Sequence, residues 1–323
     1  MKRLLLAVVG AVAAAATSRF RLLVSVFAAA FVAVFLAASQ PAQATFAGPN
    51  GKIAFSSNLA KKKNQDIYTV NPDGTGVSRL TTDPAFDSQP SWSPDGTKIA
   101  FSSERDGNVE IYLMNADGTN QTHLTNNPAI DARPSWSPDG QKITFRSNRT
   151  GDSEIYVMNA DGTGVTQLTS LPGLDTRPRY SPDGSKILFT HFADDGTSSL
   201  WMINTNGTNA RQLTPDSLQA GAGDWSPGGD RIAFANNNCG TCPASDIYVM
   251  NAAGQNIRPL TSNFANNLDP KWSPDGAQIT FEHNDPPNDF SQQQIYTMNA
   301  DGTGLFNVTH NTANNFDPDW GVG

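Results

Sequence analysis

The chain repeats one unit of 44 to 48 residues almost from residue 45 to its end. Each repeat carries an aromatic residue in a short motif, which in most repeats reads aromatic-Ser-Pro-x-Gly. The six aromatic markers are Trp92, Trp136, Tyr180, Trp225, Trp272 and Trp320. A period near 45 with several short strands in each unit is typical of a β-propeller. The repeat therefore predicts an all-β fold and excludes a second domain within residues 45–323.

One unit, residues 133–177, predicts four strands. Apolar and polar residues alternate over short runs, which is the pattern of a half-buried strand. Pro138-Asp139-Gly140 and Ala160-Asp161-Gly162 are turn signals between these runs, because proline presets φ and glycine accepts positive φ. The expected strands cover residues 134–137, 142–145, 154–158 and 166–169. Four strands make one blade of a propeller.

The two ends of the repeat array are offset from each other. The first unit begins at a turn, Pro49-Asn50-Gly51, and lacks an inner strand, whereas the chain ends on an inner strand, residues 317–320. We expect that last strand to complete blade one and close a six-bladed ring, which removes exposed sheet edges. The predicted blades are residues 48–89 with 317–320, 90–133, 134–177, 178–222, 223–269 and 270–316.

The first 44 residues contain no Asp or Glu and predict an export signal. An apolar run from Leu22 to Ala38 follows four basic residues, and Ala42-Gln43-Ala44 is a small-x-small cleavage site. An uncleaved membrane anchor is the alternative. With cleavage after Ala44 we expect a periplasmic or secreted monomer that has no stable membrane span.

The net negative charge of residues 45–323 argues against a nucleic-acid partner. The leader contains four of the 22 Lys and Arg residues and none of the 30 Asp and Glu residues, so residues 45–323 carry a net charge of −12. Nucleic acids are bound through clustered Lys and Arg side chains. A nucleic-acid partner is therefore not expected, and no cofactor is implied.

Four motifs recur in order in nearly every unit and resemble the TolB-type propeller repeat, the PD40 relative of WD40. In one unit they are Pro90–Gly96, Lys98–Phe101, Glu110–Asn115 and Leu124-Thr125. The resemblance covers residues 48–320 and implies a TolB-like propeller. Authentic TolB proteins carry an α/β domain before the propeller that takes part in the Tol envelope machinery, and the sequence has no such domain between Ala44 and Gly48.

Candidate binding residues gather on the face formed by the blade-to-blade crossings and the loops between second and third strands. Variable loops on one side of a repeat array are usually the binding face. One ring of equivalent positions there is Asp87, Asp131, Asp175, Ala220, Asn267 and Asn315. Two residues later comes a second ring, Gln89, Arg133, Arg177, Ala222, Asp269 and Asp317. These rings predict either a charged channel mouth or, for the Asp residues, caps of loop backbone N–H groups.

Further candidates lie on the same face. Phe192, Phe264 and Phe290 fall outside the scaffold positions, so each either anchors an interface or packs within its own loop. His191 and His283 occupy equivalent positions and are weak candidates for a metal site, which related propeller lyases hold with histidines near the channel. No metal is predicted.

Two further observations concern the loops and the missing motifs. Cys239 and Cys242 form the only cysteine pair and predict a loop-stapling disulfide in an exported protein. No hydrolase motif is present, so no catalytic residue is predicted.

The sequence thus predicts an exported, non-enzymatic propeller of the cell envelope that binds a protein or peptide. One alternative is a metal-dependent polysaccharide lyase or hydrolase that uses His191, His283, Arg133 and Arg177. Another is a carbohydrate-binding module. It is weakened because all twelve Trp and Tyr residues fall at two scaffold positions of the repeat, which leaves no ring for sugar stacking.

Overall fold

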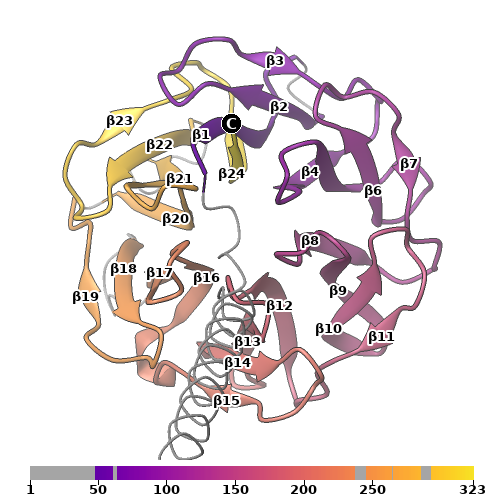
Figure 1. Cartoon of the computed structure of the whole chain (residues 1–323), viewed down its shortest axis with the longest axis vertical. Helices are drawn as coiled ribbons and strands as arrows, with labels where there is room; N and C mark the ends of the chain where they lie inside the picture. The colour runs from indigo at the N-terminus through magenta and orange to yellow at the C-terminus, as the bar shows by residue number, and fades with distance from the viewer. Residues whose placement is uncertain (1–47, 61–63, 237–244, 264, 285–291) are drawn as a thin grey trace, which may run out of the picture. The chain divides into compact units, whose positions relative to one another are not determined.

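The computed structural model describes residues 48–60, 64–236, 245–263, 265–284 and 292–323. These residues form six four-stranded antiparallel sheets arranged as blades around a central axis (Figure 1). The first strand of each blade lies nearest the axis and the fourth lies at the perimeter. The predicted all-β, six-bladed propeller is confirmed.

The strands of blades 1 to 3 follow the chain order, except that the last strand of the chain begins blade 1. Blade 1 consists of β24 (Asn315–Val322), β1 (Asn50–Ser57), β2 (Asp66–Val70) and β3 (Ser78–Arg79). Blade 2 consists of β4 (Asp87–Trp92), β5 (Lys98–Ser103), β6 (Glu110–Asn115) and β7 (Thr122–His123). Blade 3 consists of β8 (Asp131–Trp136), β9 (Lys142–Thr150), β10 (Asp152–Asn159) and β11 (Thr166–Gln167).

Blades 4 to 6 repeat the same order. Blade 4 consists of β12 (Leu174–Tyr180), β13 (Lys186–Phe192), β14 (Ser198–Asn204) and β15 (Arg211–Gln212). Blade 5 consists of β16 (Ala220–Trp225), β17 (Arg231–Asn236), β18 (Asp246–Asn251) and β19 (Arg258–Pro259), preceded by a 3₁₀ turn, η1 (Asp216–Leu218). Blade 6 consists of β20 (Asn266–Trp272), β21 (Gln278–Asn284), β22 (Gln294–Asn299) and β23 (Phe306–Asn307).

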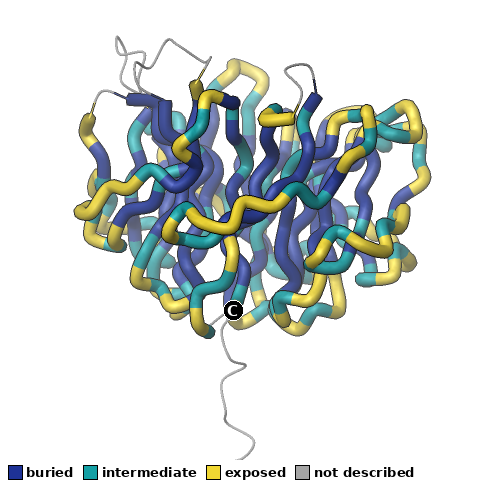
Figure 2. Tube along the Cα trace, turned by 90° about the horizontal axis from the view of Figure 1, so that it is seen from above, coloured by how far each residue is buried: buried dark blue, intermediate teal, exposed yellow. Residues whose placement is uncertain are grey.

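Neighbouring blades share their hydrophobic cores. Ala54 and Ile67 of blade 1, for example, pack with Trp92, Ile99 and Phe101 of blade 2. The phenylalanine of every second strand is fully buried. Buried positions lie mainly in the interior of the propeller, and exposed ones lie in the turns and outer strands at its periphery (Figure 2). A blade therefore cannot bury its faces without both of its neighbours.

A buried threonine fastens the short outer strand of every blade. Its Oγ1 accepts a hydrogen bond of 2.9–3.1 Å from a backbone N–H in the third strand. The six threonines are Thr81, Thr125, Thr169, Thr214, Thr261 and Thr309. A two-residue strand has few ladder bonds of its own, so this contact stabilises the edge of the blade.

Strand β24 closes the ring as the sequence predicts. It pairs antiparallel with β1, with Trp320 opposite Ile53, and the C-terminal Gly323 N–H donates to the Pro49 carbonyl at 2.8 Å. Trp320 is buried in a cluster with Phe55 and Tyr68. Residues separated by the length of the propeller thus form one blade. No helix within the described part of the chain is long and apolar enough to cross a membrane.

Deleting residues 317–323 should destabilise the whole ring. The loss of the buried Trp320 side chain alone is expected to cost roughly 3–5 kcal/mol. We therefore expect the midpoint of thermal unfolding to fall by on the order of 10 °C. Calorimetry on the deletion variant measures this, with removal of Gly323 alone as the control for an ordinary terminal trim. A midpoint that matches the control would contradict the closure argument.

Candidate functional site

Every inner strand contains an irregularity that turns one side chain toward the axis. The pairing of first and second strands shifts register at this point in all six blades. The residue there has a left-handed backbone with φ between 46° and 57°, which is uncommon outside glycine. These positions are the second ring found in the sequence, and we call them the mouth ring: Gln89, Arg133, Arg177, Ala222, Asp269 and Asp317. Five of the six precede a proline, which has no N–H to leave unpaired in the bulge.

The mouth ring encloses a narrow cavity at the axis. All six positions line it, and its volume is about 30 Å³. A buried water needs on the order of 10–15 Å³, so the cavity has room for roughly two waters. The channel at this level therefore admits no larger ligand in the conformation described.

Ion pairs cross the mouth ring from blades 3 and 4 to blades 6 and 1. Arg177 Nε lies 3.2 Å from Asp269 Oδ1, and its Nη2 donates to Asp269 Oδ2 at 3.3 Å. Arg133 Nη1 lies 3.6 Å from Asp317 Oδ1 and 3.9 Å from Asp269 Oδ2. Because these contacts join blades that are not neighbours, they couple opposite sides of the ring.

A second charged layer lies two residues further along each inner strand. We call it the inner ring: Ser91, Ser135, Arg179, Asp224, Lys271 and Asp319. Arg179 lies 3.7 Å from Asp224 and 3.8 Å from Asp319, and those two carboxylates accept backbone N–H bonds from Trp272 and Trp92. Burial raises the pKa of Asp319 to about 6. The inner ring lines a second cavity of about 60 Å³.

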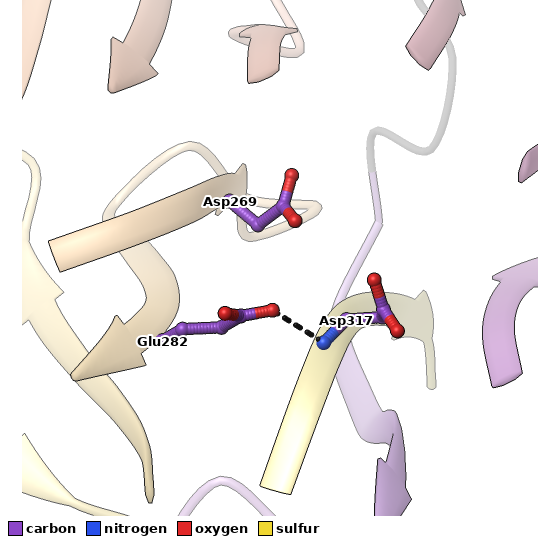
Figure 3. A group of neighbouring side chains, drawn as sticks. All are labelled: Asp269, Glu282 and Asp317. Atoms are coloured by element: carbon purple, nitrogen blue, oxygen red, sulfur yellow. Dashed lines mark hydrogen bonds between the residues drawn. The ribbon is translucent and has the colours of Figure 1, made fainter. Parts of the chain in front are cut away.

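Three carboxyl groups converge beside the mouth ring. Asp269, Glu282 and Asp317 come from β20, β21 and β24, and their ligand oxygens lie within 4.8 Å of one another (Figure 3). Glu282 Oε1 accepts the Asp317 N–H at 2.7 Å, and its Oε2 contacts the side-chain amide of Gln293. Burial, together with the charges of Asp269 and Asp317, raises the pKa of Glu282 to about 8.

The negative charge of this three-carboxyl cluster is already balanced by neighbouring cations. Burial would raise the pKa of Asp269, but Arg177, Lys271 and Arg133 outweigh it and hold that pKa well below its usual range. A pKa of about 8 favours the protonated form of Glu282 at neutral pH. Within the described residues these three side chains are the one set that could share a cation, and arginines already pair with two of them.

The first of the two rings predicted from the sequence, which begins with Asp87, lies inside the blades. Asp87, Asp131 and Asp175 are buried, and each accepts from or pairs with a side chain of its own blade. The partners are Arg105 at 3.0 Å, Arg149 at 2.8 Å and His191 Nδ1 at 2.7 Å, respectively. At the equivalent place in blade 6, His283 Nδ1 lies 2.8 Å from Asn267 Oδ1. A partner at the mouth would therefore meet the arginines of the second ring before these carboxylates.

The remaining predicted residues are divided between described and undescribed parts of the chain. Phe192 is half-buried at the end of β13, opposite Leu174. Phe264, Phe290, Cys239, Cys242 and the predicted signal peptide, residues 1–44, lie outside the described residues. Neither His191 nor His283 belongs to the set of described side chains that could share a metal.

Several channel residues were not found from the sequence as a site. They are Arg179 and Lys271 of the inner ring, Arg146 on β9 and Glu282 on β21. Counting positions across repeats would have found them. The inner ring lies two residues after the mouth ring, and Arg146 and Glu282 both follow the phenylalanine of a second strand.

Glu282→Gln should change how stability depends on pH. The folded state holds the Glu282 proton up to about pH 8, whereas the reference value is 4.5. This contribution to stability is full below the lower pKa and is lost as pH rises through the higher one. We expect the free energy of unfolding of the wild type, relative to Glu282→Gln, to fall by roughly 2–4 kcal/mol between pH 5 and 8.5.

Urea unfolding at both pH values measures this difference. Glu104→Gln, at an exposed glutamate, is the control for a change of charge without burial. Equal pH dependence of the wild type and Glu282→Gln would show that Glu282 is ionised in the folded protein.

Comparison with known proteins places this geometry in a family. The TolB β-propeller domain, PD40, matches residues 36–126, 104–163, 133–238 and 215–322. A TolB homolog from Chlorobium luteolum is 49% identical over 59 residues, a match that spans 18% of this chain and 13% of that protein's length.

Solved structures show the same fold. TolB from Acinetobacter baumannii aligns with a TM-score of 0.74 at 23% identity, over 86% of this chain and 68% of that one. A TolB described as putative from Agrobacterium tumefaciens aligns with a TM-score of 0.66 at 20% identity, over 80% and 88%. An oligogalacturonate lyase in complex with manganese aligns with a TM-score of 0.56 at 17% identity, over 79% of this chain and 73% of that one. Because the family match covers most of the sequence, the chain belongs to the TolB β-propeller family.

Proposed function

We propose that this chain is an exported, non-enzymatic propeller of the cell envelope that binds a protein or peptide on the face around the mouth ring. The observation that carries the proposal is a set of exposed apolar side chains on that face. Phe86, Ile130 and Leu174 are 42%, 37% and 48% exposed. Each stands one residue before a buried aspartate that starts or lies in the inner strand of blade 2, 3 or 4.

These three side chains occupy equivalent positions in adjacent blades. Leu59 of blade 1, which is also exposed, lies next to Asn58, whose N–H donates to the Asn314 carbonyl before β24. Exposed apolar side chains that gather beside charged groups are typical of protein interaction sites. The other exposed large apolar residues, Val77, Val165, Leu305 and Phe306, belong to the outer hairpins and strands instead.

The narrow channel also favours binding at the mouth over chemistry within the ring. Crossed ion pairs fill the axis, and the cavity between them has room for only about two waters. A partner would therefore dock on the mouth ring and its surroundings. The partly exposed guanidinium groups of Arg133 and Arg177 would be its first charged contacts.

The lyase alternative has less support from the geometry. It requires His191 and His283 to hold a metal, but neither belongs to the set of described side chains that could share a cation. Their rings also pack against Trp201 and Tyr296. The carbohydrate alternative lacks a stacking platform, because the described Trp and Tyr side chains occupy scaffold positions that are buried or half-buried.

The proposal predicts that binding depends on the mouth face. The double variant Phe86→Ser, Leu174→Ser should weaken the partner by about tenfold or more, since apolar anchors dominate such interfaces. A partner captured from an envelope extract with the wild type would be identified by mass spectrometry, purified and titrated against each variant.

Val165→Ser, Leu305→Ser is the matched control, because these side chains are equally exposed but lie at the outer hairpins. Equal weakening by both double variants, or no effect of the first, would place the binding surface elsewhere. Failure to capture any partner would return attention to polysaccharide ligands.

A further inference from the structure

One strand position carries an arginine where four of its five counterparts carry a hydrogen-bond acceptor. The residue after the second-strand phenylalanine is Ser56, Ser102, Arg146, Thr190, Ala235 and Glu282 in blades 1 to 6. In three blades this side chain accepts the backbone N–H of the mouth-ring residue in the next blade. Arg133 N–H donates to Ser102 Oγ at 3.1 Å, Ala222 N–H to Thr190 Oγ1 at 3.0 Å and Asp317 N–H to Glu282 Oε1 at 2.7 Å.

Arg146 cannot make this contact, because a guanidinium group has no acceptor. Among the described residues it forms no ion pair, and its buried Nε has no hydrogen-bond partner. Burial and the charge of Arg177 both lower the pKa of Arg146. The side chain therefore costs stability where a threonine or serine would contribute it.

The carboxylates nearest to Arg146 are already paired with other cations. Arg133, Arg146 and Arg177 interact with one another, while Asp269 and Asp317 supply two negative charges to Arg133 and Arg177. Glu282, whose pKa burial raises to about 8, forms no ion pair with Arg146. A single carboxylate from outside would neutralise Arg146 and satisfy its free donors.

Exposed apolar side chains lie in the same blade as Arg146 and in the two adjoining blades. Arg146 lies on β9 of blade 3, and Ile130 N–H donates to Asn148 Oδ1 at 2.8 Å, two residues further along that strand. Phe86 and Leu174 take the equivalent places in blades 2 and 4, which adjoin blade 3 in the ring (Figure 1).

We propose that Arg146 receives the side-chain carboxylate of an Asp or Glu in an apolar peptide segment, which lies across Phe86, Ile130 and Leu174 over blades 2 to 4. This inference rests on the proposed function and names the chemistry of its partner. A carboxylate within the segment fits better than a chain terminus, because exposed apolar side chains occur in the blades on both sides of blade 3. An acidic polysaccharide fits less well, since it would need several unpaired cations and gains little from aliphatic side chains.

The test begins with a displayed library of random 12-residue peptides, selected on the full-length chain. A selected peptide is then synthesised with blocked ends, alongside its counterpart with Glu→Gln or Asp→Asn. We expect the acidic peptide to bind the wild type about tenfold more tightly than its amide counterpart. This preference should vanish for Arg146→Thr, which carries the residue that blade 4 has at this position.

Two measurements separate recognition from folding. Arg146→Thr should unfold at the same temperature as the wild type or higher, so weaker binding cannot come from a damaged fold. Arg211→Thr, at an exposed arginine of β15, is the control for loss of one positive charge. A preference for the acidic peptide that persists in Arg146→Thr, or is lost equally in Arg211→Thr, would overturn the inference.

The outcomes also distinguish this inference from the proposed function. Peptides that depend on Phe86 and Leu174 but not on Arg146 would refute only the carboxylate contact. No selected peptide, or peptides insensitive to Phe86 and Leu174, would count against both. Binding of trigalacturonate that depends on Arg146, without peptide binding, would replace the peptide with an acidic sugar.

Discussion

The pairing of β24 with β1 is the contact on which the rest of the molecule depends. It joins residues at opposite ends of the propeller into one blade. Each blade shares its core with its neighbours, so an open array would leave two apolar faces in water. Closure also brings Asp317 and Asp319 to the axis, where they meet arginines of blades 3 and 4. The same strand thus completes the fold and the charged channel.

The channel shows how a symmetric scaffold carries an asymmetric site. All six mouth-ring residues share one left-handed backbone conformation, so the side chains enter the channel at equivalent points. Their chemistry differs, with arginines from blades 3 and 4 facing aspartates from blades 6 and 1. Buried ion pairs are costly unless both charges are well paired. Here they link blades that are not neighbours, and Arg146 is an arginine that forms no ion pair among the described residues.

Much of the fold could be predicted because it depends on local patterns. The sequence shows the Pro-Asp-Gly and Asp-Gly turns and the period-2 strands directly. It also shows that residues 49–51 begin the repeat array without an inner strand, which residues 317–320 supply. The mouth ring was also visible as a set of equivalent positions with broken symmetry. The sequence did not predict which side chains of an inner strand point into the channel. Asp87 and Gln89 are two residues apart on one strand, yet the bulge between them turns the second into the channel while the first stays in the blade.

The sequence by itself determined the repeat, the number of blades and the strand that closes the ring, because turn chemistry and side-chain alternation act over a few residues. Only the tertiary structure decided which charges meet. Arg177 and Asp269 are 92 residues apart in the chain, and their contact exists because six blades bend into a ring. The raised pKa of Glu282 and the lowered pKa of Arg146 are likewise consequences of burial among distant charges, which no local pattern in the chain encodes.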